Sequence, residues 1–149
     1  MKEKTFPVLL SVTGAARHPF PEDEIQLVTT GQLTVLPSGY RLTYRETQPD
    51  SEEYQDISLQ LDGSRVTMTR EGSYATSMVF EKGRRFESAY QTPIGCMDMS
   101  VYATRVFSRL TEDGGEVQLQ YQLDLQGQFA AVHDLRIKYA KKAAGTRSQ

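Results

Sequence analysis

Polar and apolar residues alternate with a period of two along most of the chain. The clearest example is residues 116–126, in which Val117, Leu119, Tyr121, Leu123 and Leu125 alternate with Glu, Gln and Asp. This pattern predicts a β-strand with one buried face and one solvated face. The Asp113-Gly114-Gly115 segment before it and the Gln126-Gly127-Gln128 segment after it are typical of hairpin turns.

The same alternation recurs along the chain and predicts eight to ten strands, depending on whether the long ones bend. The segments are residues 6–13, 25–36, 40–47, 56–61, 66–70, 73–81, 84–91, 95–110, 116–126 and 129–140. Most connections are two to five residues long, so consecutive strands are expected to pair antiparallel. Gly31 and Gly95 are the predicted places for a bulge or a corner. No amphipathic helical period of useful length is present.

A meander of strands that are apolar on one face and polar on the other must bury the apolar face of its own sheet. Closing the sheet into a barrel does so and also removes the exposed edges. We therefore predict an all-β fold, a single antiparallel up-and-down β-barrel, with a sandwich as the alternative. One domain covers residues 1–142, and 143–149 form a flexible tail. A small barrel is either filled by its own side chains or holds one small ligand.

Composition narrows the classes of function. The chain has 149 residues, of which 17 are basic and 19 acidic, and its formal charge of −2 argues against a dedicated nucleic-acid-binding protein. No apolar stretch is long enough for a signal peptide or a membrane span. Cys96 is the single cysteine and can form no internal disulfide, so we expect a cytoplasmic protein.

Several short segments between about residues 40 and 140 match the pattern of one known family in order and register. They are Tyr44-Arg45-Glu46-Thr47, Arg70-Glu71-Gly72, Met78-Val79-Phe80, Tyr90-Gln91-Thr92-Pro93-Ile94-Gly95, Tyr121-Gln122-Leu123 and Leu135-Arg136-Ile137. On these residues the chain resembles the YwiB-like family, uncharacterised bacterial proteins with a calycin-like, lipocalin-related β-barrel. Ile94 stands where that family tends to have an aromatic residue. The resemblance implies the barrel and, by analogy, a small-ligand pocket, but it implies no activity.

Four polar residues break the alternation by falling on otherwise apolar faces: Glu46, Arg70, Arg105 and His133. An unpaired charge is costly to bury, so each must pair, reach water or contact a ligand. We predict that Glu46 and Arg70 form an inward ion pair facing a polar mouth or cavity. Such a pair would either close one barrel end structurally or orient a ligand.

Arg105 and His133 each allow two interpretations. Alternation turns Arg105 inward, whereas a bulge in the long strand would turn it outward. His133, one of only two histidines, would serve as a ligand anchor or general base, or as a hydrogen-bonded core residue. Its neighbour Asp134 points to the opposite face of a regular strand, so the two cannot form a catalytic dyad unless a bulge intervenes.

Methionine and tyrosine side chains also fall on inward faces, where they would line an adaptable pocket or simply fill the core. The candidate ligand-binding set is Tyr44, Glu46, Arg70, Met78, Tyr90, Met97, Met99, Tyr121 and His133. No motif for nucleophilic catalysis, phosphate binding or a transition metal is present, so we predict no catalytic residue, metal or cofactor.

Three hypotheses for the function follow. The first is a non-enzymatic barrel that binds a small, partly apolar molecule. The alternative is a plugged barrel that interacts with other proteins or forms a homodimer through its outer surface, for example along the long strand at 95–110. The third, an enzyme that uses Glu46 or His133 as general acid or base, is the least favoured, because no nucleophile, base and orienting group occur together.

Overall fold

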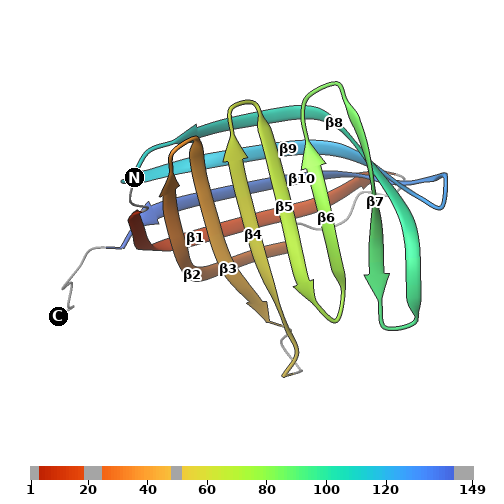
Figure 1. Ribbon diagram of the computed structural model, residues 1–149, viewed down its shortest axis with the longest axis horizontal. Coiled ribbons are helices and arrows are strands. Elements are labelled where there is room, and N and C mark those ends of the chain that lie inside the picture. The colour runs from red at the N-terminus through yellow and green to blue at the C-terminus, as the bar shows by residue number, and fades with distance from the viewer. Residues whose placement is uncertain (1–3, 19–24, 48–51, 143–149) are drawn as a thin grey trace.

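A computed structural model describes residues 4–18, 25–47 and 52–142 (Figure 1). The tail predicted at 143–149 lies outside these described residues. The strands are β1 (Lys4–His18), β2 (Ile25–Leu36), β3 (Gly39–Thr47), β4 (Tyr54–Asp62), β5 (Arg65–Gly72), β6 (Ala75–Phe80), β7 (Arg85–Thr92), β8 (Gly95–Leu110), β9 (Gly114–Leu125) and β10 (Gln128–Lys141). Each coincides with one predicted segment, with ends that differ by a few residues.

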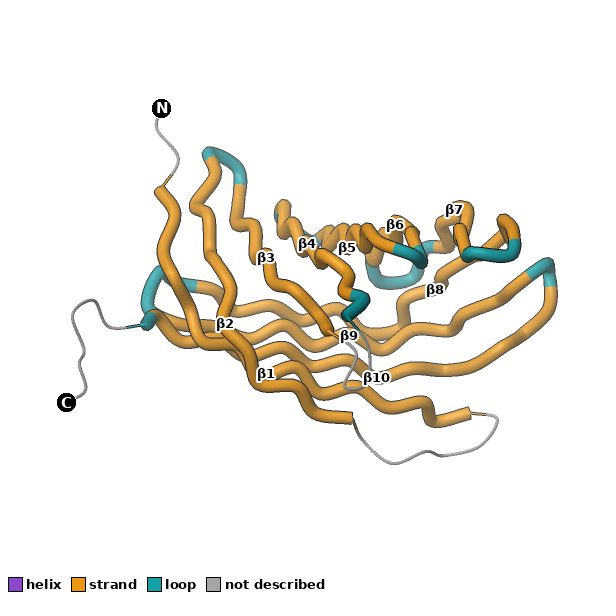
Figure 2. Tube along the Cα trace, turned by 90° about the horizontal axis from the view of Figure 1, so that it is seen from below, coloured by secondary structure: helices purple, strands orange, loops and turns teal. Residues whose placement is uncertain are grey.

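The ten strands form one closed up-and-down barrel. Every strand pairs antiparallel with its neighbours in sequence, and β10 pairs with β1 to close the sheet (Figure 2). The shorter strands β3–β7 lie across the long strands β8–β10 and β1 (Figure 1). The predicted all-β barrel is confirmed, and the sandwich alternative is wrong. Within the described residues, no helix has the length and apolar character needed to cross a membrane.

The inward faces of the strands build one hydrophobic core. Its largest fully buried side chains are Phe80, Leu10, Leu33, Leu42, Ile57, Leu59, Ile137, Val8, Val66, Val101 and Val117. They come from nine of the ten strands, so most of the interior is filled by packed side chains rather than left open. Any space for a ligand is therefore restricted to an end of the barrel.

A bulge in β8 decides how Arg105 is oriented. The pairing of β8 with β9 shifts between Ala103 and Arg105, so Thr104 is an extra residue without a partner. Arg105 consequently pairs with Gln120 and lies exposed on the outer face, while Ala103 stays buried. The inward orientation given by simple alternation is wrong, and the bulge interpretation is confirmed.

Gly31 and Gly95, the two predicted positions for a bulge or a corner, have different roles in the structure. No register shift occurs at Gly31, so a bulge there is wrong. An added Cβ at Gly31 would lie 2.3 Å from the Thr43 carbonyl oxygen, so glycine is needed there because two backbones approach closely. Gly95 opens β8 directly after the two-residue turn that joins it to β7, and its φ of 144° is one that favours glycine.

Candidate functional site

A cavity opens at the end of the barrel where β3 ends and β2 begins. It has a volume of about 300 Å³ and is lined by Val12, Gly14, Ala15, Ala16, Leu27, Tyr44, Glu46, Met68, Arg70, Met78, Tyr121, His133, Asp134 and Leu135. We call it the mouth cavity. Six of the nine predicted site residues line it: Tyr44, Glu46, Arg70, Met78, Tyr121 and His133. Strands distant in sequence bring them together, because closure places β3, β5 and β6 opposite β9 and β10.

The predicted ion pair stands at the polar side of the mouth cavity. Arg70 Nη1 donates to Glu46 Oε1 at 2.7 Å and to Gln55 Oε1 at 2.9 Å. The Arg70 and Glu46 side chains are 28% and 36% exposed, so the pair is half-buried. The inward ion pair facing a cavity is therefore confirmed.

Gln55 is the member of this network that sequence reasoning missed. Its side chain is buried on β4, on the same inward face as Ile57 and Leu59. The sequence does indicate an inward side chain at residue 55, because this position continues the alternation of Ile57 and Leu59 by one step. The predicted strand began at residue 56, however, and a glutamine one step before an apolar run looks like the preceding loop.

Two tyrosines border the cavity with buried rings. Tyr44 and Tyr121 are each 8% exposed. Burial raises the pKa of the Tyr44 phenol to about 12, and the nearby Glu46 carboxylate adds to the rise while Arg70 opposes it. Burial likewise raises the pKa of Tyr121 to about 12, against the influence of Arg70. Both hydroxyls therefore stay protonated near neutral pH and lie within the electrostatic reach of the Arg70 guanidinium.

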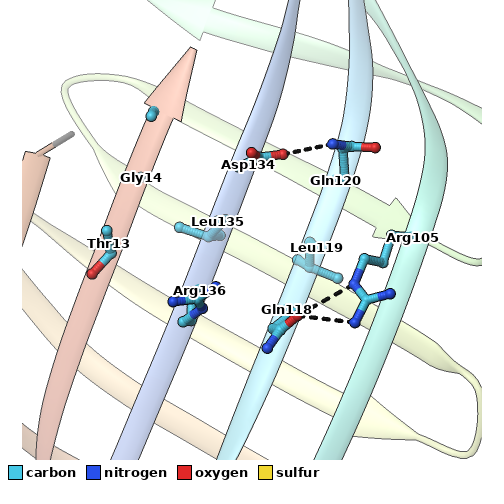
Figure 3. Close-up of a pocket in the computed structure, with 10 residues that line it drawn as sticks. Thr13, Gly14, Arg105, Gln118, Leu119, Gln120, Asp134, Leu135 and Arg136 are labelled. Carbon is cyan, nitrogen blue, oxygen red and sulfur yellow. Dashed lines mark hydrogen bonds between the residues drawn. The ribbon is translucent and has the colours of Figure 1, made fainter. Parts of the chain in front are cut away.

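His133 belongs to the aromatic side of the cavity. Its ring stacks on Tyr121 with centroids 5.5 Å apart and planes 11° from parallel. Tyr121 also packs against Phe80 in the core, at a centroid distance of 4.8 Å. Asp134 turns its carboxylate to the outer face, where Gln120 Nε2 donates to it at 2.9 Å (Figure 3). The two neighbours thus face opposite sides of β10, as predicted.

The remaining wall of the mouth cavity is apolar. Met68 on β5 and Met78 on β6 pair directly across the sheet and line the cavity together. Val12, Leu27 and Leu135 complete this side. The cavity therefore combines a charged, hydrogen-bonding end with a flexible apolar wall, the combination found in small-molecule sites.

Three predicted site residues do not reach the mouth cavity. Tyr90 and Met97 line a second hollow of about 400 Å³ at the turn between β7 and β8, where Ile94 is 98% exposed. Met99 is buried in the core, with its sulfur 4.0 Å from Thr76 Oγ1. Alternation assigns a side chain to one face of a strand, but it does not say which hollow the side chain reaches.

A third hollow, of about 200 Å³, lies on the outer face of β1, β10, β9 and β8. Its polar groups satisfy each other: Arg105 Nε and Nη2 donate to Gln118 Oε1 at 3.2 and 3.1 Å (Figure 3). Among the described residues, no three His, Cys, Asp or Glu side chains gather where they could hold a metal ion. The mouth cavity is therefore the better candidate for a functional site.

Comparisons with known proteins agree with this fold. A family model described as a domain of unknown function (DUF1934) matches residues 10–137. No curated protein matches the chain significantly in sequence. The crystal structure of the ywiB protein from Bacillus subtilis is similar, with a TM-score of 0.83 and 20% identity over 95% of this chain and 96% of that chain. This confirms the resemblance, and a closed ten-stranded barrel is consistent with the calycin-like fold that it implies. At this identity the likeness concerns the fold alone.

Proposed function

This chain belongs to the DUF1934 family of domains of unknown function, and on that premise we propose that it binds one small, partly apolar molecule in the mouth cavity without catalysis. The observation that carries the proposal is the pairing of a polar end, built by Glu46, Arg70 and two tyrosines, with an apolar methionine wall. The volume of about 300 Å³ is at the lower limit of sites that hold small ligands.

The chemistry of the lining favours binding over catalysis. No serine, threonine, cysteine or lysine is among the described residues that line the mouth cavity. Glu46 is already engaged by Arg70 and His133 stacks on Tyr121, so neither is placed beside a nucleophile that it could activate. The single cysteine, Cys96, is exposed and forms no disulfide within the chain, which suits the cytoplasm as the proposed location.

A second candidate function is self-association through the outer surface. It is favoured by the hollow at the turn between β7 and β8, where the fully exposed Ile94 stands beside Tyr74, which is 41% exposed. Large apolar side chains in this position mark interaction surfaces when they are grouped. A homodimer formed through this hollow would be broken by Ile94→Asp.

Native mass spectrometry distinguishes these candidates. The protein is purified without denaturation from the cells that produce it, and Ala16→Phe is compared with the wild type, because a large ring at this position of the lining would fill the mouth cavity. Ala140→Leu, an exposed position on β10, is the matched control. Circular dichroism confirms that each variant is folded.

We expect the wild type and Ala140→Leu to retain a small-molecule adduct that Ala16→Phe lacks. An adduct of equal occupancy on folded Ala16→Phe, or no adduct on the wild type, would count against binding in the mouth cavity. A dimer without a small-molecule adduct, which Ile94→Asp converts to a monomer, would favour self-association instead.

A further inference from the structure

We propose that the mouth cavity selects an uncharged molecule with a hydrogen-bond-accepting oxygen, such as the carbonyl of an amide, ketone or ester, which the hydroxyls of Tyr44 and Tyr121 bind. This inference rests on the proposed function and names the chemical class of its ligand. It is carried by two hydroxyl groups that have no hydrogen-bond partner among the described residues and by the balance of charge around them.

Both tyrosine hydroxyls are available to a ligand. Neither Tyr44 nor Tyr121 forms a side-chain hydrogen bond with the described residues, although both rings are more than nine-tenths buried. Yet no fully buried side-chain oxygen or nitrogen of the described residues lacks a partner. The two hydroxyls must therefore be reachable from the cavity that their side chains line. Because the hydroxyls are reachable and have no partner among the described residues, a ligand oxygen can take the place of water on them.

The charges at the polar end favour an uncharged ligand. Arg70 is held by Glu46 at 2.7 Å, so its positive charge is already balanced. A ligand carboxylate would have to share Arg70 with the Glu46 carboxylate, and a ligand cation would have to approach Glu46 beside Arg70. A neutral carbonyl meets neither repulsion, and it can accept from both phenols.

The rest of the lining limits the size and polarity of the ligand. A volume of about 300 Å³ corresponds to roughly ten water molecules, and so to on the order of ten non-hydrogen atoms. Met68, Met78 and Val12 offer only apolar contact to the part of the ligand away from the tyrosines. The expected ligand is therefore compact, with one polar end.

Three probes of one skeleton test the assignment: phenylacetamide, phenylacetate and ethylbenzene. Each is titrated into ¹⁵N-labelled protein, and affinities are taken from backbone amide shifts around the mouth cavity. The informative variant is Tyr44→Phe/Tyr121→Phe, which removes only the two hydroxyls. Tyr90→Phe is the matched control, because Tyr90 lines the second hollow and not the mouth cavity.

We expect phenylacetamide to bind about tenfold more tightly than either of the other probes, as two hydrogen bonds would provide. The double variant should lose this advantage and bind ethylbenzene as before, while Tyr90→Phe should behave like the wild type. Phenylacetate binding at least as tightly as the amide, or an undiminished amide affinity in the double variant, would overturn the ligand class and leave the proposed function standing. If no probe shifted any amide around the cavity, the proposed function would fail as well.

Discussion

Arg70 is the residue on which the polar end of the mouth cavity depends. One of its guanidinium nitrogens serves two acceptors, the Glu46 carboxylate and the Gln55 amide oxygen. The ion pair itself is half-exposed, and pairs of this kind contribute little stability on their own. Gln55 is buried, however, so its amide oxygen depends more on the guanidinium than the half-exposed Glu46 carboxylate does. The hydrogen bond from Arg70 to Gln55 therefore contributes more to the stability of the fold than the ion pair with Glu46 does.

This difference predicts unequal effects of two substitutions. Arg70→Met should lower the free energy of unfolding by about 1–3 kcal/mol, because it leaves a buried amide oxygen without a donor. Glu46→Gln should cost under about 1 kcal/mol, because the new amide oxygen still accepts from Arg70. Urea denaturation of both variants measures the two values. Equal losses would show that the contact with Gln55 contributes nothing.

Among the strands, β8 is long and contains a bulge, which keeps its apolar side chains directed into the core on both sides of Thr104. Thr104 stands outside the pairing, and the faces before and after it keep their partners: Ala103 opposite Tyr121 and Val106 opposite Leu119. Its hydroxyl donates to the Gln120 carbonyl oxygen at 3.1 Å, which anchors the extra residue. The strand thus gains a residue without exchanging its inner and outer faces.

Deletion of Thr104 should therefore be tolerated, because Arg105 would still pair with Gln120 in a regular ladder. Deletion of Tyr102, two residues earlier in the same strand, should lower the melting temperature further, because a regular ladder then turns Ala103 outward and places Thr104 in the core opposite Tyr121. Thermal unfolding followed by circular dichroism compares the two. A melting temperature of the Thr104 deletion no higher than that of the Tyr102 deletion would show that Thr104 is not the dispensable residue of the bulge.

Alternation was sufficient to predict all ten strands and the Glu46–Arg70 pair, because both depend only on which face a side chain occupies. It could not place the bulge at Thr104, since a threonine suits a regular strand equally well. It also could not separate Tyr90 and Met97 from the mouth cavity. That separation depends on strand tilt and on the position of each residue along the barrel, which only the closed structure defines.

At the scale of the whole molecule, the barrel is largely solid and keeps one end open. Three tyrosines lie at the margins of this core. Burial raises the pKa of Tyr44, Tyr121 and Tyr139 to about 12, from an ordinary value of 10.0. Tyr139 donates its hydroxyl proton to the Thr111 carbonyl oxygen at 2.6 Å, outside the mouth cavity. The folded state therefore holds these protons more tightly than the unfolded chain does.

This predicts that the protein loses stability in strong alkali. Between pH 10 and about 12 the unfolded chain releases phenolic protons that the folded state retains, so the free energy of unfolding falls as the pH rises through this range. Below pH 10 the contribution is complete. Urea denaturation at pH 9 and pH 11 measures the fall, which should be smaller in Tyr44→Phe/Tyr121→Phe. An equal fall in the double variant would mean that the two cavity tyrosines are not responsible.

The proposed function depends on the open end of this barrel being a binding site with a defined polar end. A crystal structure of the protein soaked with phenylacetamide tests it most directly. We expect the probe in the mouth cavity, with its carbonyl oxygen within hydrogen-bond distance of the Tyr44 and Tyr121 hydroxyls and the Glu46–Arg70 pair intact. A mouth cavity filled by the protein's own side chains, or a probe bound only in the hollow beside Ile94, would contradict it.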